Sequence, residues 1–174
     1  KDWKWYNISK NPNITWDIIK NNPDKDWSWS NISRNPNITW EIIQNNPDKK
    51  WDWSNISINP NITWEIIENN PNKGWNWKYT LSDRVDIPLD IIKTNLDKPW
   101  NWMRLSMKSN ITEEFIQTNF NKEFNWFNLS RHRNVTWKFI QDNIHFDWEW
   151  CCISNNPNIT WEIIQNNPDN PWNW

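Results

Sequence analysis

The chain has 174 residues, including 20 Trp, one Gly and no Ala, and Asn fills about a fifth of the positions. Its formal net charge of −2 argues against a dedicated nucleic-acid-binding protein, because such proteins carry a strong basic excess. No apolar run reaches the roughly 18 residues of a membrane-spanning helix, and two adjacent Cys residues exclude a scaffold held by disulfides. Because neither an initiator Met nor a signal-peptide pattern is present, we expect Lys1 to begin a fragment of a longer protein.

A tandem repeat accounts for the whole sequence. The segment WDWSNISINPNITWEIIENNPNKG, which begins at Trp51, recurs every 24 residues, apart from one step of 25 residues between Trp75 and Trp100. Seven full repeats and the start of an eighth predict one domain over residues 1–174. Repeats close to the consensus fill 1–73, divergent repeats fill 74–146, and 147–174 holds one consensus-like repeat and the partial one.

Every Trp belongs to one of three columns of the repeat. The first and second Trp columns are the two rings of each Trp-x-Trp pair, from Trp3 and Trp5 to Trp172 and Trp174, with Phe124 as the one exception. The third Trp column contains Trp16, Trp40, Trp64, Trp137 and Trp161, with Leu89 and Glu113 in two repeats. One Ser (Ser9 to Ser154) and one Asn (Asn22 to Asn167) are also present in all seven repeats. No Trp is therefore left over for a special site.

The segment Ile38–Pro47 represents the first predicted element, a short helix. Its apolar residues lie at helical spacing and share an arc of about 200°. Thr39 is expected to cap the N-terminus of this helix, as the corresponding Thr does elsewhere. The fixed Asn46 is expected to take a left-handed conformation at the C-terminus, before Pro47.

The next segment, Asp48–Ser57, carries the Trp-x-Trp pair and has two interpretations. As a helix, it places Trp51, Trp53 and Ile56 on one side. Its N-caps would then be four acidic residues: Asp24, Asp48, Asp97 and Asp169. As a strand, Trp-x-Trp has the period of two that one buried face requires. The residues between the two Trp are poor strand formers, which favours the helix.

We therefore predict an all-α fold, in which short helix-turn-helix repeats stack as an α-solenoid. The alternative is a leucine-rich-repeat-like α/β solenoid. Helices of about eight residues are unstable alone, so each repeat must bury its apolar residues against its neighbours. The first two Trp columns are assigned to the core, and the third is the better surface candidate because it tolerates Glu113.

The core of the repeat resembles a known sequence pattern. NPNITWEIIQNNPD, found from Asn35 and again from Asn156, is followed here by WDW or WNW. It is similar to a tandem repeat in proteins of giant DNA viruses of amoebae, the mimivirus relatives, which has no established activity. The resemblance implies a viral origin, with the host cytoplasm or the virion as the location. The AT-rich codons of Asn, Ile and Lys agree with that origin.

Ten Asn residues form N-glycosylation sequons: Asn7, Asn13, Asn31, Asn37, Asn55, Asn61, Asn110, Asn128, Asn134 and Asn158. In a secreted protein, this density would indicate a glycosylated fibre. The alternative is that Ser and Thr are fixed by packing and capping while Asn fills turns, so that each repeat creates sequons automatically. The second interpretation is favoured.

Basic residues gather in the divergent repeats, in or near the turn between the two halves. They are Arg84, Arg104, Lys108, Arg131, His132 and Arg133. If the repeats stack, these side chains form a positive ridge that holds an acidic protein segment or phosphates. The alternative, which is favoured, is that cations simply follow the C-terminus of a helix, as the helix dipole prefers.

No residue pattern predicts catalysis, a metal site or a cofactor. Cys151 and Cys152 have only His132 and His145 as further soft ligands, on different turns, which is unlike a zinc site. A phosphate-binding loop needs several Gly, and Gly74 is the only one. The acidic residues recur with the repeat instead of forming one singular constellation.

The sequence therefore predicts a non-enzymatic repeat scaffold that presents a protein-interaction surface, with specificity in residues 74–146. Its partner would be another protein or a second copy of the array. One alternative is a structural filament or virion-surface protein carrying glycans. A third hypothesis is a carbohydrate-binding module that uses the third Trp column.

Overall fold

The computed structural model describes residues 3–173, and these form two compact halves that divide after Arg84. The N-terminal half is Lys1–Arg84 and the C-terminal half is Val85–Trp174. Over the described residues the only regular elements are short helices, without a single strand. The all-α prediction is therefore confirmed, and the leucine-rich-repeat-like alternative is wrong. No helix in residues 3–173 combines the length and the apolar character needed to cross a bilayer.

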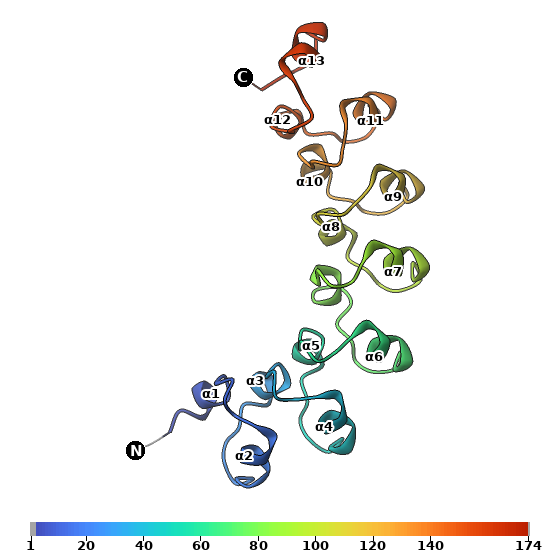
Figure 1. Cartoon of the computed structure of the whole chain (residues 1–174). Coiled ribbons are helices and arrows are strands. Elements are labelled where there is room, and N and C mark those ends of the chain that lie inside the picture. Colours follow the sequence, from blue (N-terminus) through green and yellow to red (C-terminus); the bar gives the residue numbers. More distant parts are fainter. Residues whose placement is uncertain (1–2, 174) are drawn as a thin grey trace. The chain divides into compact units, whose positions relative to one another are not determined.

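Each repeat contains two helices, which we call helix A and helix B (Figure 1). The helices A are α1 (Trp5–Ile8), α3 (Trp29–Ser33), α5 (Trp53–Ile56), the 3₁₀ helix η1 (Leu81–Asp83), α8 (Trp102–Leu105), α10 (Trp126–Ser130) and α12 (Trp150–Ile153). The helices B are α2 (Trp16–Lys20), α4 (Trp40–Asn45), α6 (Trp64–Asn69), α7 (Leu89–Thr94), α9 (Glu113–Thr118), α11 (Trp137–Asp142) and α13 (Trp161–Asn166). Helix A begins at the second Trp column, except for η1, which begins at Leu81, and helix B begins at the third column.

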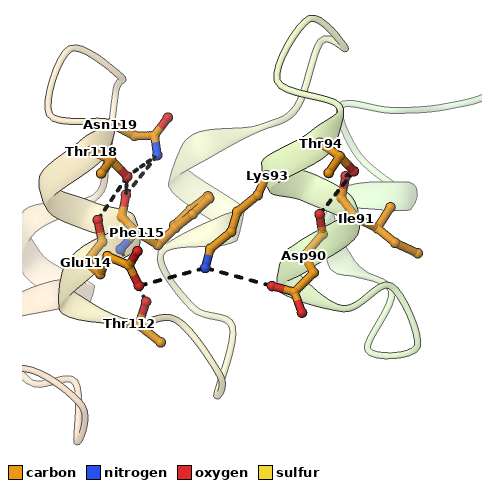
Figure 2. Close-up of polar contacts among 9 residues, drawn as sticks. All are labelled: Asp90, Ile91, Lys93, Thr94, Thr112, Glu114, Phe115, Thr118 and Asn119. Atoms are coloured by element: carbon orange, nitrogen blue, oxygen red, sulfur yellow. Dashed lines mark hydrogen bonds and ion pairs between the residues drawn. The ribbon is translucent and has the colours of Figure 1, made fainter.

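Side chains cap both ends of helix B, except in α7, where Pro88 is the N-cap and makes no such bond. In α9, the hydroxyl of Thr112 accepts the N–H of Phe115 at 3.2 Å, and the amide of Asn119 donates to the Phe115 carbonyl at 2.9 Å (Figure 2). The Thr cap predicted at Thr39 is likewise present, at 3.3 Å from the Ile42 nitrogen. The left-handed conformation predicted for Asn46 is wrong, because its φ is −133°. Its side-chain amide satisfies a terminal carbonyl directly, so the left-handed turn that usually does this is unnecessary.

Helix A starts later than predicted. The proposed caps Asp24, Asp48, Asp97 and Asp169 all lie in the turn before the first Trp, and the first three pair with the following Lys at 2.8–3.0 Å. The first Trp is held outside the helix, because the Trp51 indole N–H donates to the Asn46 carbonyl at 2.7 Å. The N-cap is instead the residue between the two Trp. Asp52, for example, accepts the N–H of Asn55 at 3.1 Å.

Aromatic rings connect each repeat to the next within each half. The second Trp of one pair meets the first Trp of the following pair edge to face, as in Trp53–Trp75 at 5.2 Å between centroids and Trp126–Trp148 at 4.9 Å. The first Trp column is buried in most repeats, which confirms its place in the core, whereas the second column, also assigned to the core, is half-buried at every described position. The third column is mostly half-buried rather than on the surface, and only Trp161 of that column is largely exposed, at 62%.

Phenylalanines compensate where the third Trp column is interrupted. Leu89 interrupts the column in one repeat, and Phe115 of the next repeat stacks on Trp102 with centroids 5.7 Å apart. Glu113 interrupts it in another, and Phe146 of the following repeat stacks on Trp126 with centroids 4.7 Å apart. The ring lost from one repeat is thus replaced by a ring from a later position in the chain.

The fixed Ser joins the backbones of successive repeats. Ser57 is fully buried, and its hydroxyl donates to the Trp53 carbonyl at 2.7 Å while accepting the N–H of Asn76 at 3.0 Å. The same acceptor role recurs at Ser9, Ser33, Ser106, Ser130 and Ser154. In each case the donor is the residue between the two Trp of the next repeat, so one hydroxyl holds the start of the next helix A in place.

The 25-residue repeat absorbs its extra residue by widening one turn. The N–H groups of Leu81 and Ser82 donate to carbonyls five residues earlier, on Asn76 and Trp77. In α5, the matching Ser57 N–H reaches back four residues, to Trp53. The wider turn shortens helix A to η1 but keeps the Ser82 hydroxyl on the Trp77 carbonyl, at 2.7 Å.

Candidate protein-interaction surface

A buried Asn links each consensus repeat to the one before it. Asn59 is fully buried, and its amide nitrogen lies 3.0–3.2 Å from the carbonyls of Ser33, Asn35 and Ile38. Its side-chain oxygen accepts the N–H of Asn61 at 2.9 Å. Asn156 makes the equivalent contacts in the C-terminal half. We call this place in the repeat the bridging position.

Three of the predicted ridge residues occupy this bridging position. In the N-terminal half, Arg84 donates to the Ser57 carbonyl at 3.2 Å. In the C-terminal half, Lys108 donates to the Ile87 carbonyl and His132 contacts the Lys108 carbonyl, both at 3.2 Å. These cations are half-buried and replace the Asn amide against the preceding repeat. Steps of 24 or 25 residues along the chain from Asn59 lead to each of these residues. The repeat period therefore predicts the bridging position, which clustered charge alone does not.

The contacts of His132 define its tautomer. Its Nδ1 accepts the N–H of Asn134 at 3.2 Å, so the ring hydrogen lies on Nε2 and points to the Lys108 carbonyl. Burial, opposed by the hydrogen bond to Lys108 and aided by the charge of Arg133, lowers the pKa of His132 below 6.5. Protonation would break the bond from Asn134, because Nδ1 would become a donor.

The remaining ridge residues of the C-terminal half differ in exposure. Arg131 and Arg133 are exposed, whereas Arg104 is half-buried on α8. Together with His132, Arg131 and Arg133 line one groove of about 360 Å³. The other lining residues are Ser106, Met107, Ser109, Asn128 and Pro157, so no carboxylate is among them. Only half of the predicted ridge therefore contributes to a single surface.

Exposed apolar side chains occur in and next to this groove. Met107 lines it with 64% of its surface exposed, and Met103, one helical turn earlier, is 53% exposed. Phe127 of α10 is 46% exposed, and the Arg131 guanidinium lies 4.9 Å from its ring centre. Arg131 also donates to the side-chain oxygen of Asn128 at 3.3 Å. The groove thus combines fixed positive charge with accessible Met and Phe.

Most sequon amides are already used in hydrogen bonds. Asn61 donates from Nδ2 to the carbonyls of Pro36 and Ile38, at 2.7 and 3.0 Å. Nδ2 contacts with the preceding repeat also occur at Asn31, Asn37, Asn55, Asn134 and Asn158. Asn128 is half-buried in the groove, whereas Asn7, Asn13 and Asn110 are exposed.

The two cysteines differ in exposure. Cys151 is exposed and Cys152 is buried, with 3.8 Å between their sulfur atoms and no disulfide. Burial and the contact with Cys151 raise the pKa of Cys152 to about 11, so its thiol stays protonated. Within residues 3–173, no three His, Cys, Asp or Glu side chains gather as metal ligands would.

The N-terminal half has an aromatic cavity of about 180 Å³ at the third Trp column. Trp16, Trp27 and Trp29 form much of its wall. Lysines from the same repeats and the next one also line it, and each pairs with a nearby Asp: Lys20 with Asp17, Lys25 with Asp24 and Lys49 with Asp48. The cavity is therefore apolar with a charge-balanced rim.

Comparison of the chain with protein-family models, curated proteins and solved structures finds no match.

Proposed function

We propose that this protein is a non-enzymatic repeat scaffold whose C-terminal half presents a protein-interaction surface. One observation carries the proposal. The Ser, Asn and Trp that the repeats share are used between repeats, whereas the exposed side chains of the groove, Met107, Arg131 and Arg133, stand at positions where the repeats differ. Side chains that are free to differ from the repeat are those that distinguish one binding surface from another.

The composition of the groove supports a protein partner. Met, aromatic residues and Arg are enriched where proteins bind one another. Met adapts its shape to different partners. Met107 and Phe127 offer exposed apolar area beside Arg131. Singly exposed apolar residues need no explanation, but a contiguous group of them favours an interaction site.

Selection of displayed random peptides on the folded chain tests the proposal. A counter-selection uses the triple variant Met107→Ser, Arg131→Ser and Arg133→Ser, which keeps every Ser, Asn and Trp column. We expect peptides that bind the parent chain and bind the triple variant at least about tenfold more weakly, a difference of about 1.4 kcal/mol. Circular dichroism confirms that the variant is folded. Failure to enrich any peptide, or equal binding to both chains, would overturn the proposal.

The aromatic cavity at Trp16 favours a second candidate, carbohydrate binding. Sugar rings stack on Trp, and the charged pairs at the rim supply hydrogen-bonding groups. A glycan array probed with the parent chain and with Trp16→Ala tests it. Loss of a specific glycan signal in a folded Trp16→Ala protein, with no loss in Trp161→Ala, would support this function. Absence of any glycan signal would exclude it.

A further inference from the structure

We infer that the partner segment of the groove is an acidic peptide that carries at least one apolar side chain. The inference rests on the proposed function and adds the chemistry of the partner. Two features of the groove lead to it: arginines that lack an acidic partner, and exposed apolar side chains directly beside them.

The two arginines differ from the lysines that form ion pairs. Lysines such as Lys25, Lys49 and Lys138 have a carboxylate within 2.7–3.0 Å. Arg131 and Arg133 have no such pair in the described residues, and the groove lining contains no Asp or Glu. Two positive charges without a neighbouring carboxylate attract negative groups, and Arg binds carboxylates through paired hydrogen bonds.

Arg131 is also held in place before any partner arrives. Its guanidinium rests over the Phe127 ring at 4.9 Å and donates one hydrogen bond to Asn128. A guanidinium has five N–H donors, so most of them remain for a carboxylate. Fixing the side chain in advance reduces the conformational entropy that binding must overcome.

The apolar neighbours decide between classes of acidic partner. Met107 lines the same groove with 64% of its surface exposed, so a ligand that reaches the arginines also covers this Met side chain. An acidic peptide with a Leu or Phe satisfies both groups at once. Nucleic acid offers an unbroken row of phosphates with nothing for Met107, and its binding is dominated by a larger positive surface than two arginines provide.

Fluorescence anisotropy with short synthetic peptides tests the inference on the full chain. The probe is a labelled peptide composed of Glu and Leu, and its comparison peptides replace every Glu by Gln or every Leu by Ser. The variant is Arg131→Glu with Arg133→Glu. Its matched control is Arg34→Glu, because Arg34 donates to Asn31 at 3.2 Å in the N-terminal half, as Arg131 does to Asn128. A labelled single-stranded oligonucleotide serves as the nucleic-acid probe.

We expect the Glu–Leu peptide to bind the parent chain and Arg34→Glu equally, and the double variant about tenfold more weakly. Binding falls as salt is added, and both comparison peptides bind more weakly than the probe. Equal affinity for the Gln peptide, stronger binding of the oligonucleotide, or no effect of the double variant would overturn the inference. If displayed peptides of another composition still bind at the groove, the proposed function stands although this inference fails. If no displayed peptide binds there, the inference and the proposed function both fail.

Discussion

At the scale of single residues, the fixed Ser of this repeat serves two partners. The Ser57 hydroxyl both donates within its own helix and accepts from the next repeat. A side chain that makes two such hydrogen bonds cannot be replaced without leaving one buried group unsatisfied, which explains why these positions do not vary between repeats.

Replacing Ser57 by Ala isolates one such contact. The change leaves the Asn76 N–H without its acceptor, so we expect the free energy of unfolding to fall by about 1–3 kcal/mol. Urea unfolding followed by circular dichroism measures the loss. Ser109→Ala, at an exposed position, is the control and should change stability by less than about 0.5 kcal/mol. Equal losses in the two variants would contradict the role of Ser57.

His132 makes the stability of its half depend on pH. Its pKa lies below 6.5 in the folded chain, so the unfolded chain binds the proton first as the pH falls. The contribution of neutral His132 is therefore complete above about pH 7 and is lost as the pH drops through 6.5 and then through the lowered pKa.

The variant His132→Asn provides the reference, because Asn is the residue that bridges at Asn59 and Asn156. We expect the parent chain to lose more stability than His132→Asn between about pH 7 and pH 5 in thermal melts. The difference between the two profiles removes the contribution of all other titrating groups. Parallel profiles would show that folding does not lower the pKa of His132.

At the scale of elements, periodicity predicted the helices and their Thr caps but misplaced two boundaries. Apolar spacing indicates which residues share a face, and this was sufficient for both helices of the repeat. It carries no information on the turn at Asn46, where a side-chain amide replaces the left-handed residue. Nor does it reveal that an indole hydrogen bond holds Trp51 outside helix A, which moved the cap from Asp48 to Asp52.

Deleting Tyr79 tests how the 25-residue repeat works. The deletion leaves Trp77 and the Ser four residues apart, as in Trp53–Ser57, so hydrogen bonds to the fourth residue back become possible. We expect the 3₁₀ turn to become α-helical, with a small rise in helical circular dichroism and an unchanged or higher urea midpoint. Deleting Arg104 is the matched control.

The control deletion has the opposite consequence. Removing Arg104 rotates the buried Leu105 by about 100° away from the core, which should cost about 2–5 kcal/mol. If loss of Tyr79 is as harmful as loss of Arg104, the wide turn is required by the fold and is not merely an accommodation of one extra residue.

At the scale of the whole molecule, the repeat explains both what the sequence predicted of the candidate site and what it missed. Charge clustering found Arg131 and Arg133 in the groove. It grouped them with Lys108 and His132 because net charge does not distinguish a cation that faces solvent from one that bridges two repeats. Met107 was missed, since exposure of a single Met depends on how neighbouring repeats pack and not on the local sequence.

Hydrogen bonds between successive repeats also limit glycosylation of the array. Attachment of a glycan replaces one of the two hydrogens on Nδ2. Asn61 uses both hydrogens, on the Pro36 and Ile38 carbonyls, and Asn158 uses both on Arg133 and Val135. A glycan at either site removes one bond and inserts a sugar between two repeats, so the glycosylated chain should not reach this fold.

Expression through a secretory pathway, followed by separation of folded from aggregated protein, tests that limit. Peptide mass spectrometry then reads the occupancy of each sequon. We expect glycans in the folded fraction only at exposed sites such as Asn7, Asn13 and Asn110, and enrichment of Asn61 and Asn158 glycans in the aggregate. Asn61→Gln removes the sequon without adding a glycan. Its loss of stability should therefore measure the lost hydrogen bonds alone, about 0.5–1.5 kcal/mol each. Folded protein with full occupancy at Asn61 would show that the repeats separate far enough to admit a sugar, and would restore the glycosylated fibre as the better account of the array.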